Sequence, residues 1–224
     1  MMMIRPALLN DGRLVGGITT RAFAPPEESL DETRARLGEA IGLPVASVGQ
    51  VHEARVSTVT EAGHVPAHDG LVTDRPGVLL TVIAADCGLV LLADPEAGVV
   101  GACHSGWRGT VAGIAGETIR AMVRLGAEPE RVRAYLGPCI SVEAFEVGEE
   151  VAAHFDAAVV RRRPDWPRPH VDLKDEITRQ LTEAGVSSVE VDPACTVGDN
   201  DRFYSYRTEA GTAGRIVGFV GRRP

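Results

Sequence analysis

The sequence has 224 residues, of which 44% are apolar and only 4% are aromatic, and its formal net charge is −8. A chain of this length buries roughly 70% of the surface that it exposes when unfolded, which is enough for an aliphatic core without structural disulfides. Its acidic surface excludes nucleic acid and anionic membranes as favoured partners, because such a surface repels phosphate groups.

The first third of the chain alternates between strand, helix and loop patterns. Residues 14–20 predict a strand, and residues 30–41 predict a helix that ends at Gly42. Apolar and polar residues nearly alternate over residues 45–59, as in a half-buried strand. Glycine, histidine, proline and aspartate are frequent over residues 61–77, where a loop is expected.

The rest of the chain is richer in buried strands. Continuous apolar runs predict strands at residues 78–84, 89–93 and 99–103, each buried on both faces. An apolar stripe from Val111 to Val123 then predicts a helix over residues 111–125. Further elements are expected in this order: a strand at 131–136, helices at 147–155 and 172–184, and strands at 188–191 and 216–220. With no repeat and no linker, residues 1–224 are interpreted as one mixed α/β domain.

Several observations indicate a cytoplasmic protein. The N-terminus lacks the basic region and long apolar stretch of a signal peptide. The most apolar segment, residues 78–93, contains Asp86 and is shorter than the ~20 residues that span a bilayer. Four cysteines are too few for a disulfide scaffold. We therefore expect reduced thiols that are available as metal ligands.

Three residues are candidate ligands of one metal ion. Cys87 and His104 each lie where a buried strand passes into a turn with glycine, a place where side chains usually face a cleft. His52 lies in the predicted strand 45–59, on the same face as Gln50. One thiolate and two imidazoles suit zinc, or copper, and leave a fourth position for water. The metal would lower the pKa of that water and supply a hydroxide nucleophile.

These residues also have other interpretations. Cys87 could be a small core residue, Asp86 could cap a turn, and His52 could simply be hydrogen-bonded. In a rival mechanism Cys87 or Cys103 is a nucleophile and His104 is its base. The pairing of Cys103 with His104 is disfavoured, because adjacent strand residues point to opposite faces.

A second histidine pair is less suited to a metal. His64 and His68 are four residues apart, as in a helical metal-binding pair, but Pro66 lies between them and the surrounding composition is that of a loop. We therefore interpret these two histidines as parts of a loop.

Residues 106–110 form a candidate anion site. They lead into the predicted helix, whose N-terminus would offer free N–H groups and the positive end of a dipole. Arg108 adds a fixed cation, so this segment suits a phosphate. Alternatively, Thr110 caps the helix and Arg108 pairs with a surface carboxylate. We interpret Gly109, Gly113 and Gly116 as positions that allow close packing of the helix on the sheet.

Several motifs occur in a recognisable order along the chain. They are Gln50-Val51-His52, Asp69-Gly70-Leu71-Val72-Thr73, Ala85-Asp86-Cys87, His104-Ser105-Gly106-Trp107-Arg108-Gly109, Leu136-Gly137-Pro138-Cys139-Ile140, Phe145-Glu146-Val147-Gly148, Cys195-Thr196 and Phe203-Tyr204-Ser205-Tyr206-Arg207. In these motifs the sequence resembles the laccase-domain family, also called the polyphenol oxidoreductase or peptidoglycan editing factor family. The resemblance covers about residues 45–220. It is most specific where the ADC motif is followed by HxGWRG.

The resemblance implies a sandwich of β-sheets with flanking helices, related to the catalytic domains of deamidating toxins. It implies metal ligation by His52, Cys87 and His104, with zinc as the usual metal and copper as a reported one. The family's activities include phosphorolysis of adenosine, inosine, guanosine and methylthioadenosine, and deamination of adenosine. Members have also been linked to removal of misplaced L-serine from peptidoglycan precursors.

Two segments depart from the family pattern. Gly16-Gly17-Ile18-Thr19-Thr20-Arg21 is followed by Ala22-Phe23-Ala24, where members often carry an aromatic before Thr-Thr-Arg and then Gly-Gly-Val-Ser. Arg207 stands alone where two arginines are usual. Either segment could line the substrate pocket.

On this basis the expected function is a metal-dependent purine nucleoside phosphorylase with adenosine deaminase activity, acting on a purine nucleoside and phosphate. Arg108 would hold the phosphate, and Asp86 or Glu146 would carry the proton. The substrate-binding candidates are Gln50, Arg21, Trp107, Arg108 and Gly109. The sequence makes no prediction of oligomeric state.

The same residues also allow two other functions. One is a metal-dependent amidase that edits serine-containing peptidoglycan precursors, and another is a non-catalytic nucleoside-binding protein. A multicopper oxidase is disfavoured, because it needs many histidines in His-x-His pairs, whereas this chain has six histidines and no such pair.

Overall fold

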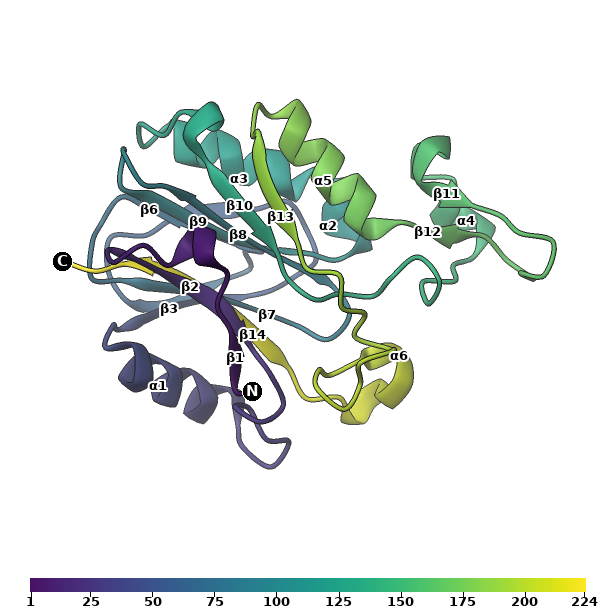
Figure 1. Cartoon of the computed structure of the whole chain (residues 1–224), viewed down its shortest axis with the longest axis horizontal. Helices are drawn as coiled ribbons and strands as arrows, with labels where there is room; N and C mark the ends of the chain where they lie inside the picture. The colour runs from purple at the N-terminus through teal and green to yellow at the C-terminus, as the bar shows by residue number, and fades with distance from the viewer.

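Two six-stranded sheets form the centre of the computed structural model, which describes residues 1–224 (Figure 1). The strands of the first sheet lie in the order β1 (Met3–Ile4), β2 (Leu14–Thr19), β14 (Ile216–Arg222), β7 (Leu79–Ala84), β3 (Val45–Gly49) and β5 (Gly63–Pro66). Neighbours are antiparallel from β1 to β7 and parallel from β7 to β5.

The second sheet is also mixed. Its strands lie in the order β13 (Ser188–Val191), β10 (Arg133–Leu136), β8 (Gly88–Asp94), β9 (Val99–Ser105), β6 (Gly70–Thr73) and β4 (Val56–Thr58). The pairs at its two edges are parallel and the three inner pairs are antiparallel. A separate two-stranded ribbon joins β11 (Val160–Arg161) to β12 (His170–Val171).

Helices cover the outer faces of both sheets, and an aliphatic core fills the space between the two sheets. Helix α1 (Leu30–Ile41) packs Leu37 and Ile41 on the outer face of the first sheet. Helices α3 (Ile114–Val123) and α5 (Leu173–Glu183) lie together over the second sheet, on the opposite side from α1 (Figure 1). The predicted mixed α/β sandwich with flanking helices is therefore confirmed.

The bounds of α1 follow from signals that are local in the sequence. Ser29 accepts a hydrogen bond from the backbone N–H of Glu32, whose carboxylate accepts one from the backbone N–H of Ser29. Gly42 ends the helix in the left-handed region, at φ 78°. Because both signals are local, the predicted helix 30–41 has the observed bounds.

The predicted strand over residues 45–59 is wrong. The segment divides into β3 and β4, which belong to different sheets, and a loop over residues 50–55 joins them. The backbone N–H groups of Val51, His52 and Glu53 donate to the Asp69 carboxylate, so they are not available to a strand ladder. His52 also has a positive φ of 63°. Gln50 and His52 therefore do not share a strand face.

The expected loop over residues 61–77 contains the strands β5 and β6. Each is only four residues long and pairs with a strand distant in sequence, β5 with β3 and β6 with both β4 and β9. Tertiary pairing thus overrides a local composition that is rich in glycine and proline.

The expected helix over residues 111–125 is two helices. Helix α2 (Trp107–Val111) starts inside the HxGWRG motif, and Gly113, at φ 79°, separates it from α3. Val111 and Val123 are 41% and 44% exposed, so both ends of the predicted apolar stripe face solvent. Of the expected helix 147–155, only α4 (Glu149–Ala152) forms, while α6 (Tyr206–Glu209) was not expected.

The chain passes from the first sheet to the second three times at the same end of the sandwich, and the connection between β5 and β6 carries Asp69. The β3–β4 connection carries His52, and the β7–β8 connection carries Cys87. His104 lies near the C-terminal end of β9, where Gly88 of β8 pairs with Ser105. The three candidate ligands therefore reach one place through the sheet topology. None of the helices has the length and hydropathy of a membrane span.

Candidate metal centre

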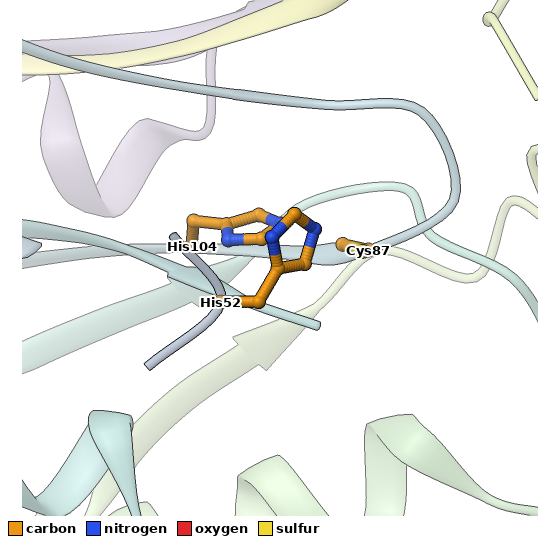
Figure 2. A group of neighbouring side chains, drawn as sticks. All are labelled: His52, Cys87 and His104. Carbon is orange, nitrogen blue, oxygen red and sulfur yellow. The ribbon is translucent and has the colours of Figure 1, made fainter. Parts of the chain in front are cut away.

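His52, Cys87 and His104 point toward one another between the ends of the two sheets (Figure 2). One potential ligand atom from each residue lies within 4.8 Å of the others. The two imidazole rings are perpendicular, with centroids 4.9 Å apart. Ligands of one zinc ion lie roughly 3–4 Å from each other, because each bond measures about 2.0–2.3 Å. Small side-chain rotations would bring these three groups to that spacing.

Asp69 organises two of the three candidate ligands. Its fully buried carboxylate accepts hydrogen bonds from the backbone N–H groups of Val51, His52 and Glu53, at 3.1, 3.0 and 2.9 Å. The same carboxylate lies 2.9 Å from Nδ1 of His104. A carboxylate on one imidazole nitrogen leaves the other nitrogen directed at a metal. Asp69 thus holds the His52 loop and orients the His104 ring.

The ionisation of this cluster follows from the same contacts. Burial would raise the pKa of Asp69, but its hydrogen bonds from His104 and from the three backbone amides outweigh burial and lower that pKa. Burial would lower the pKa of His104, but the contacts with Asp69 and Cys87 raise it to about 9. The pKa of His52 is lowered by burial and by the charges of His104, Arg108 and Arg215. A neutral His52 is the form that binds a metal.

Cys87 is held in place by a strained turn. Asp86 has a positive φ of 85°, which is unfavourable for a residue with a side chain. Its carboxylate accepts hydrogen bonds from Oγ1 of Thr196 and from the backbone N–H of Arg207, both at 2.6 Å. Its backbone carbonyl accepts one from the N–H of Ile140. These three bonds stabilise the turn that presents the Cys87 sulfur.

Gly106 leaves room for the three ligands. A Cβ atom at this position would lie 2.9 Å from Sγ of Cys87 and 3.4 Å from ring carbons of both His52 and His104. Gly106 also begins α2 with an extended φ of −74°, so its backbone conformation does not require glycine. The requirement is steric, because any side chain would enter the cluster.

The cluster opens into a cavity of about 710 Å³. This volume lies in the range of small-molecule sites, roughly 300–1,000 Å³. Its wall includes the three candidate ligands, several apolar side chains and the rings of Trp107, Phe145 and Tyr206. A small polar molecule with an aromatic part could therefore bind beside the cluster.

Three other residues predicted to act at the site lie in the cavity wall: Asp86, Gln50 and Trp107. Asp86 is the only carboxylic acid among the wall residues. Both ends of the Gln50 side-chain amide hydrogen-bond to the backbone of Ile83, at 2.8 and 2.9 Å. Gln50 therefore fixes the start of the His52 loop on β7.

Four other predicted residues lie outside the wall. Arg108 is exposed and stacks on the Trp107 ring, with its guanidinium carbon 4.2 Å from the ring centroid. Arg21 pairs with Glu209. Only the backbone carbonyl of Glu146 is engaged near the site, by the Arg207 side chain. Gly109 is buried where a Cβ would lie 3.3 Å from the carbonyl oxygen of Glu53, so it packs α2 against the His52 loop.

The thiol mechanism with Cys103 receives no support from the geometry. Cys103 packs in the core beneath α3, while His104 faces the metal cluster, as expected for adjacent residues of a strand. Burial raises the pKa of the Cys103 thiol to about 12. A thiol with this pKa is not a nucleophile near neutral pH.

Several residues that the structure brings to the site have no role in the prediction from the sequence. Asp69 is a lone acid before an apolar strand, a signal that indicates a paired or functional carboxylate. Arg34 and Arg215 also line the cavity. Neither had a sequence signal, because Arg34 lies on a charged helix and Arg215 precedes an ordinary strand. His64 lies in the wall and is hydrogen-bonded to Ser47, whereas His68 lies outside the wall and contacts the backbone carbonyl of Pro66.

Comparisons with known proteins agree on one family. A family model described as multi-copper polyphenol oxidoreductase laccase matches residues 23–223. A protein of Deinococcus radiodurans named purine nucleoside phosphorylase is 45% identical over 198 residues, covering 85% of this chain and 76% of its own. A Streptomyces griseus protein named purine nucleoside phosphorylase ORF3 is 41% identical over an alignment that covers 86% of this chain and 81% of that protein. The crystal structure of YlmD from Geobacillus stearothermophilus superposes with a TM-score of 0.88 at 30% identity, covering 100% and 97%.

Proposed function

The chain belongs to the multi-copper polyphenol oxidoreductase laccase family, and from that premise we propose that it is a metal-dependent purine nucleoside phosphorylase. The observation that carries the proposal is the His52, Cys87 and His104 cluster, which opens into a cavity of nucleoside size. The names of the Deinococcus and Streptomyces relatives support the choice of reaction.

The donor set fits a zinc ion, with copper as the alternative. His52, Cys87 and His104 would hold the metal, and the hydrogen bond between Asp69 and Nδ1 of His104 directs Nε2 of that ring toward it. A bound zinc ion would supply Lewis acidity and would lower the pKa of water beside it toward neutrality. One cluster of three ligands suits one metal ion rather than the several of a multicopper oxidase.

Phosphorolysis breaks the bond between C1′ of the ribose and N9 of the purine, and joins an oxygen of phosphate to C1′. The electron pair of the broken bond leaves with the purine, which gains a proton. Asp86, the only carboxylic acid in the cavity wall, is the proposed proton carrier. The apolar wall around Trp107 and Phe145 would limit the access of water, which would otherwise hydrolyse the nucleoside.

The direct experiment incubates zinc-loaded protein with adenosine, with and without inorganic phosphate, and measures adenine and ribose 1-phosphate. We expect both products only when phosphate is present. Absence of both at high enzyme concentration would refute phosphorolysis. Parallel reactions with inosine, guanosine and methylthioadenosine would define the preferred base.

Deamination of adenosine is proposed as a second reaction of the same cluster. It replaces the 6-amino group of adenine by an oxygen from water and releases ammonia, and a metal site of this donor type suits that chemistry. Inosine formed without phosphate would identify it. Release of serine from a muramoyl-serine nucleotide would instead indicate the amidase, and tight adenosine binding without turnover would indicate a binding protein.

A further inference from the structure

The side chains that line the cavity carry a net positive charge, whereas the rest of the protein carries a net negative charge. Three arginines, Arg34, Arg207 and Arg215, contribute to its wall, against the single carboxylate of Asp86. The chain as a whole has a net charge of −8. A positive cavity in an acidic protein focuses its field on small anions, so the cavity favours an anionic ligand.

The three arginines differ in how far their guanidinium groups are already engaged. Arg207 donates from Nη1 and Nη2 to the backbone carbonyls of Ala144 and Glu146, at 3.2 and 3.0 Å. Arg215 donates only from Nη1, to the carbonyls of Ala213 and Gly214, and has no carboxylate within ion-pair distance. Arg207 thus holds the loop that carries Phe145, while Arg215 retains free donors.

Arg34 is the least satisfied of the three. The residue is only 8% exposed, and its Nε has no hydrogen-bond partner. Its nearest acid is Asp31, whose side chain is 96% exposed and lies 3.5 Å from Nη1. Burial lowers the pKa of Arg34 by more than its contact with Asp31 raises it, so Asp31 offsets only part of the cost of burying this charge. A buried N–H without an acceptor, such as the Nε–H of Arg34, is costly unless a ligand supplies one.

Arg34 and Arg215 both line the cavity, and each has Leu30 as a neighbour in its wall. Leu30 lies one helical turn before Arg34 on α1, and both residues line the cavity with Arg215. Leu30 and Arg215 also share a small adjoining pocket. The three candidate metal ligands line the same cavity as these two arginines, so an anion bound there would share the cavity with the metal cluster.

We propose that Arg34 and Arg215 bind the phosphate dianion that acts as co-substrate, beside the metal cluster. This inference rests on the proposed function and replaces Arg108, which lies outside the cavity wall, as the phosphate ligand. A planar guanidinium presents paired N–H donors that match two phosphate oxygens. Phosphate would supply an acceptor for Nε of Arg34, and in the cavity that it shares with His52 it would direct an oxygen toward the ribose.

The alternative is that Arg34 is a structural residue paired with Asp31. Removing Asp31 separates the two interpretations. If the ion pair is structural, Asp31→Ala and Arg34→Met should have the same effect. If Arg34 binds phosphate, Asp31→Ala should leave phosphate binding unchanged or strengthen it, because a competing carboxylate has been removed.

The experiment measures binding of inorganic phosphate to the zinc-loaded protein by calorimetry, together with the KM values for phosphate and adenosine. For Arg34→Met we expect phosphate affinity to fall by about tenfold to hundredfold and the phosphate KM to rise similarly, as after loss of a charged hydrogen bond. The adenosine KM should change by less than about threefold, a small effect on the scale of such bonds. Arg34→Lys should lose less affinity. Arg124→Met, at an exposed arginine after α3, is the control.

Each outcome is decisive for one of the two claims. If the wild type performs phosphorolysis but Arg34→Met keeps its phosphate affinity and KM, the anion site is refuted and the proposed function stands. If the wild type binds phosphate through Arg34 without phosphorolysis, the proposed function fails and the anion site stands. Binding of adenosine monophosphate but not of free phosphate would refute the co-substrate and indicate a phosphorylated substrate. A loss in Asp31→Ala equal to that in Arg34→Met would refute the site.

Discussion

Two buried aspartates, Asp69 and Asp94, lie at opposite ends of the second sheet and use their charge in the same way. Asp69 accepts hydrogen bonds from three backbone amides and contacts the His104 ring. Asp94 also accepts from three backbone amides, those of Glu96, Ala97 and Glu128, and contacts the Arg131 guanidinium. Each carboxylate is fully buried, and its hydrogen bonds outweigh burial and lower its pKa.

The two aspartates differ in the side chain that each contacts besides the three backbone amides. Arg131 is a partly exposed cation whose contacts are ion pairs with acidic side chains. The Asp94 cluster therefore closes a turn and supports the fold. The His104 ring has a second nitrogen, which faces His52 and Cys87. The same carboxylate anchor is thus structural at one end and part of a candidate metal centre at the other.

The largest effect is expected from a substitution at the candidate metal centre. Cys87→Ala removes one of three ligands, so we expect bound zinc to fall to background and phosphorolysis to fall by at least about hundredfold. Metal analysis and product assays measure both. Cys103→Ala is the matched control, because Cys103 is a core cysteine next to His104 in sequence. A Cys87→Ala protein that keeps its zinc would indicate a nucleophilic cysteine instead of a ligand.

The next effect is expected at Asp69. Asp69→Asn keeps the size of the side chain but removes the charge that orients His104, so zinc affinity should fall by about tenfold to hundredfold. Competition with a chromophoric chelator measures the affinity. The variant should also be less stable, because three amides lose a charged acceptor. Unchanged zinc affinity would mean that Asp69, like Asp94, only stabilises the fold.

Asp94→Asn should affect stability alone. We expect the free energy of unfolding to fall by about 2–4 kcal/mol, because buried amides and Arg131 lose a charged partner. Urea unfolding of the zinc-free protein measures this change. Zinc affinity should equal that of the wild type, since the cluster lies at the other end of β9. Any loss of zinc affinity would show that the two ends are coupled.

The pH dependence of stability should also separate the two ends. Both aspartates have lowered pKa values, so their contributions are present above their unfolded pKa of about 3.9 and are lost as pH falls through their folded values. His104 has a pKa raised to about 9, so its contribution is present below an unfolded pKa of about 6.5 and is lost as pH rises through about 9. In zinc-free protein, Asp69→Asn should weaken the alkaline decline, with the contact to Cys87 retaining part of it, and Asp94→Asn should leave it unchanged. Urea midpoints measured across pH test this.

The smallest expected effect is steric. Gly106→Ala places a methyl group 2.9 Å from the Cys87 sulfur, so the ligands must shift, and we expect zinc affinity to fall by about tenfold or less. Gly116→Ala on α3 is the control, because its Cβ would meet only the flexible end of Arg120 at 3.5 Å. Zinc titration measures both variants. Equal affinities would mean that the cluster has more room than the structure indicates.

Local signals in the sequence determined much of this protein. The capping residues of α1 and the apolar runs of β7, β8 and β9 were enough to predict a mixed α/β domain and to make His52, Cys87 and His104 candidate ligands. The sandwich arrangement was implied by the family resemblance that the ADC and HxGWRG motifs carry. The local signals succeeded because hydrophobic periodicity and capping depend on neighbouring residues.

Tertiary structure alone decided the remaining features. The segment 45–59 reads as one strand, but the distant Asp69 carboxylate takes its amides and sends β3 and β4 into different sheets. Arg108 stands in the most recognisable motif yet lies outside the cavity wall, whereas Arg34, in an ordinary amphipathic helix, lies in it. The physical reason is that a buried charge is placed by the partners that fold around it, and those partners come from segments far apart in the sequence.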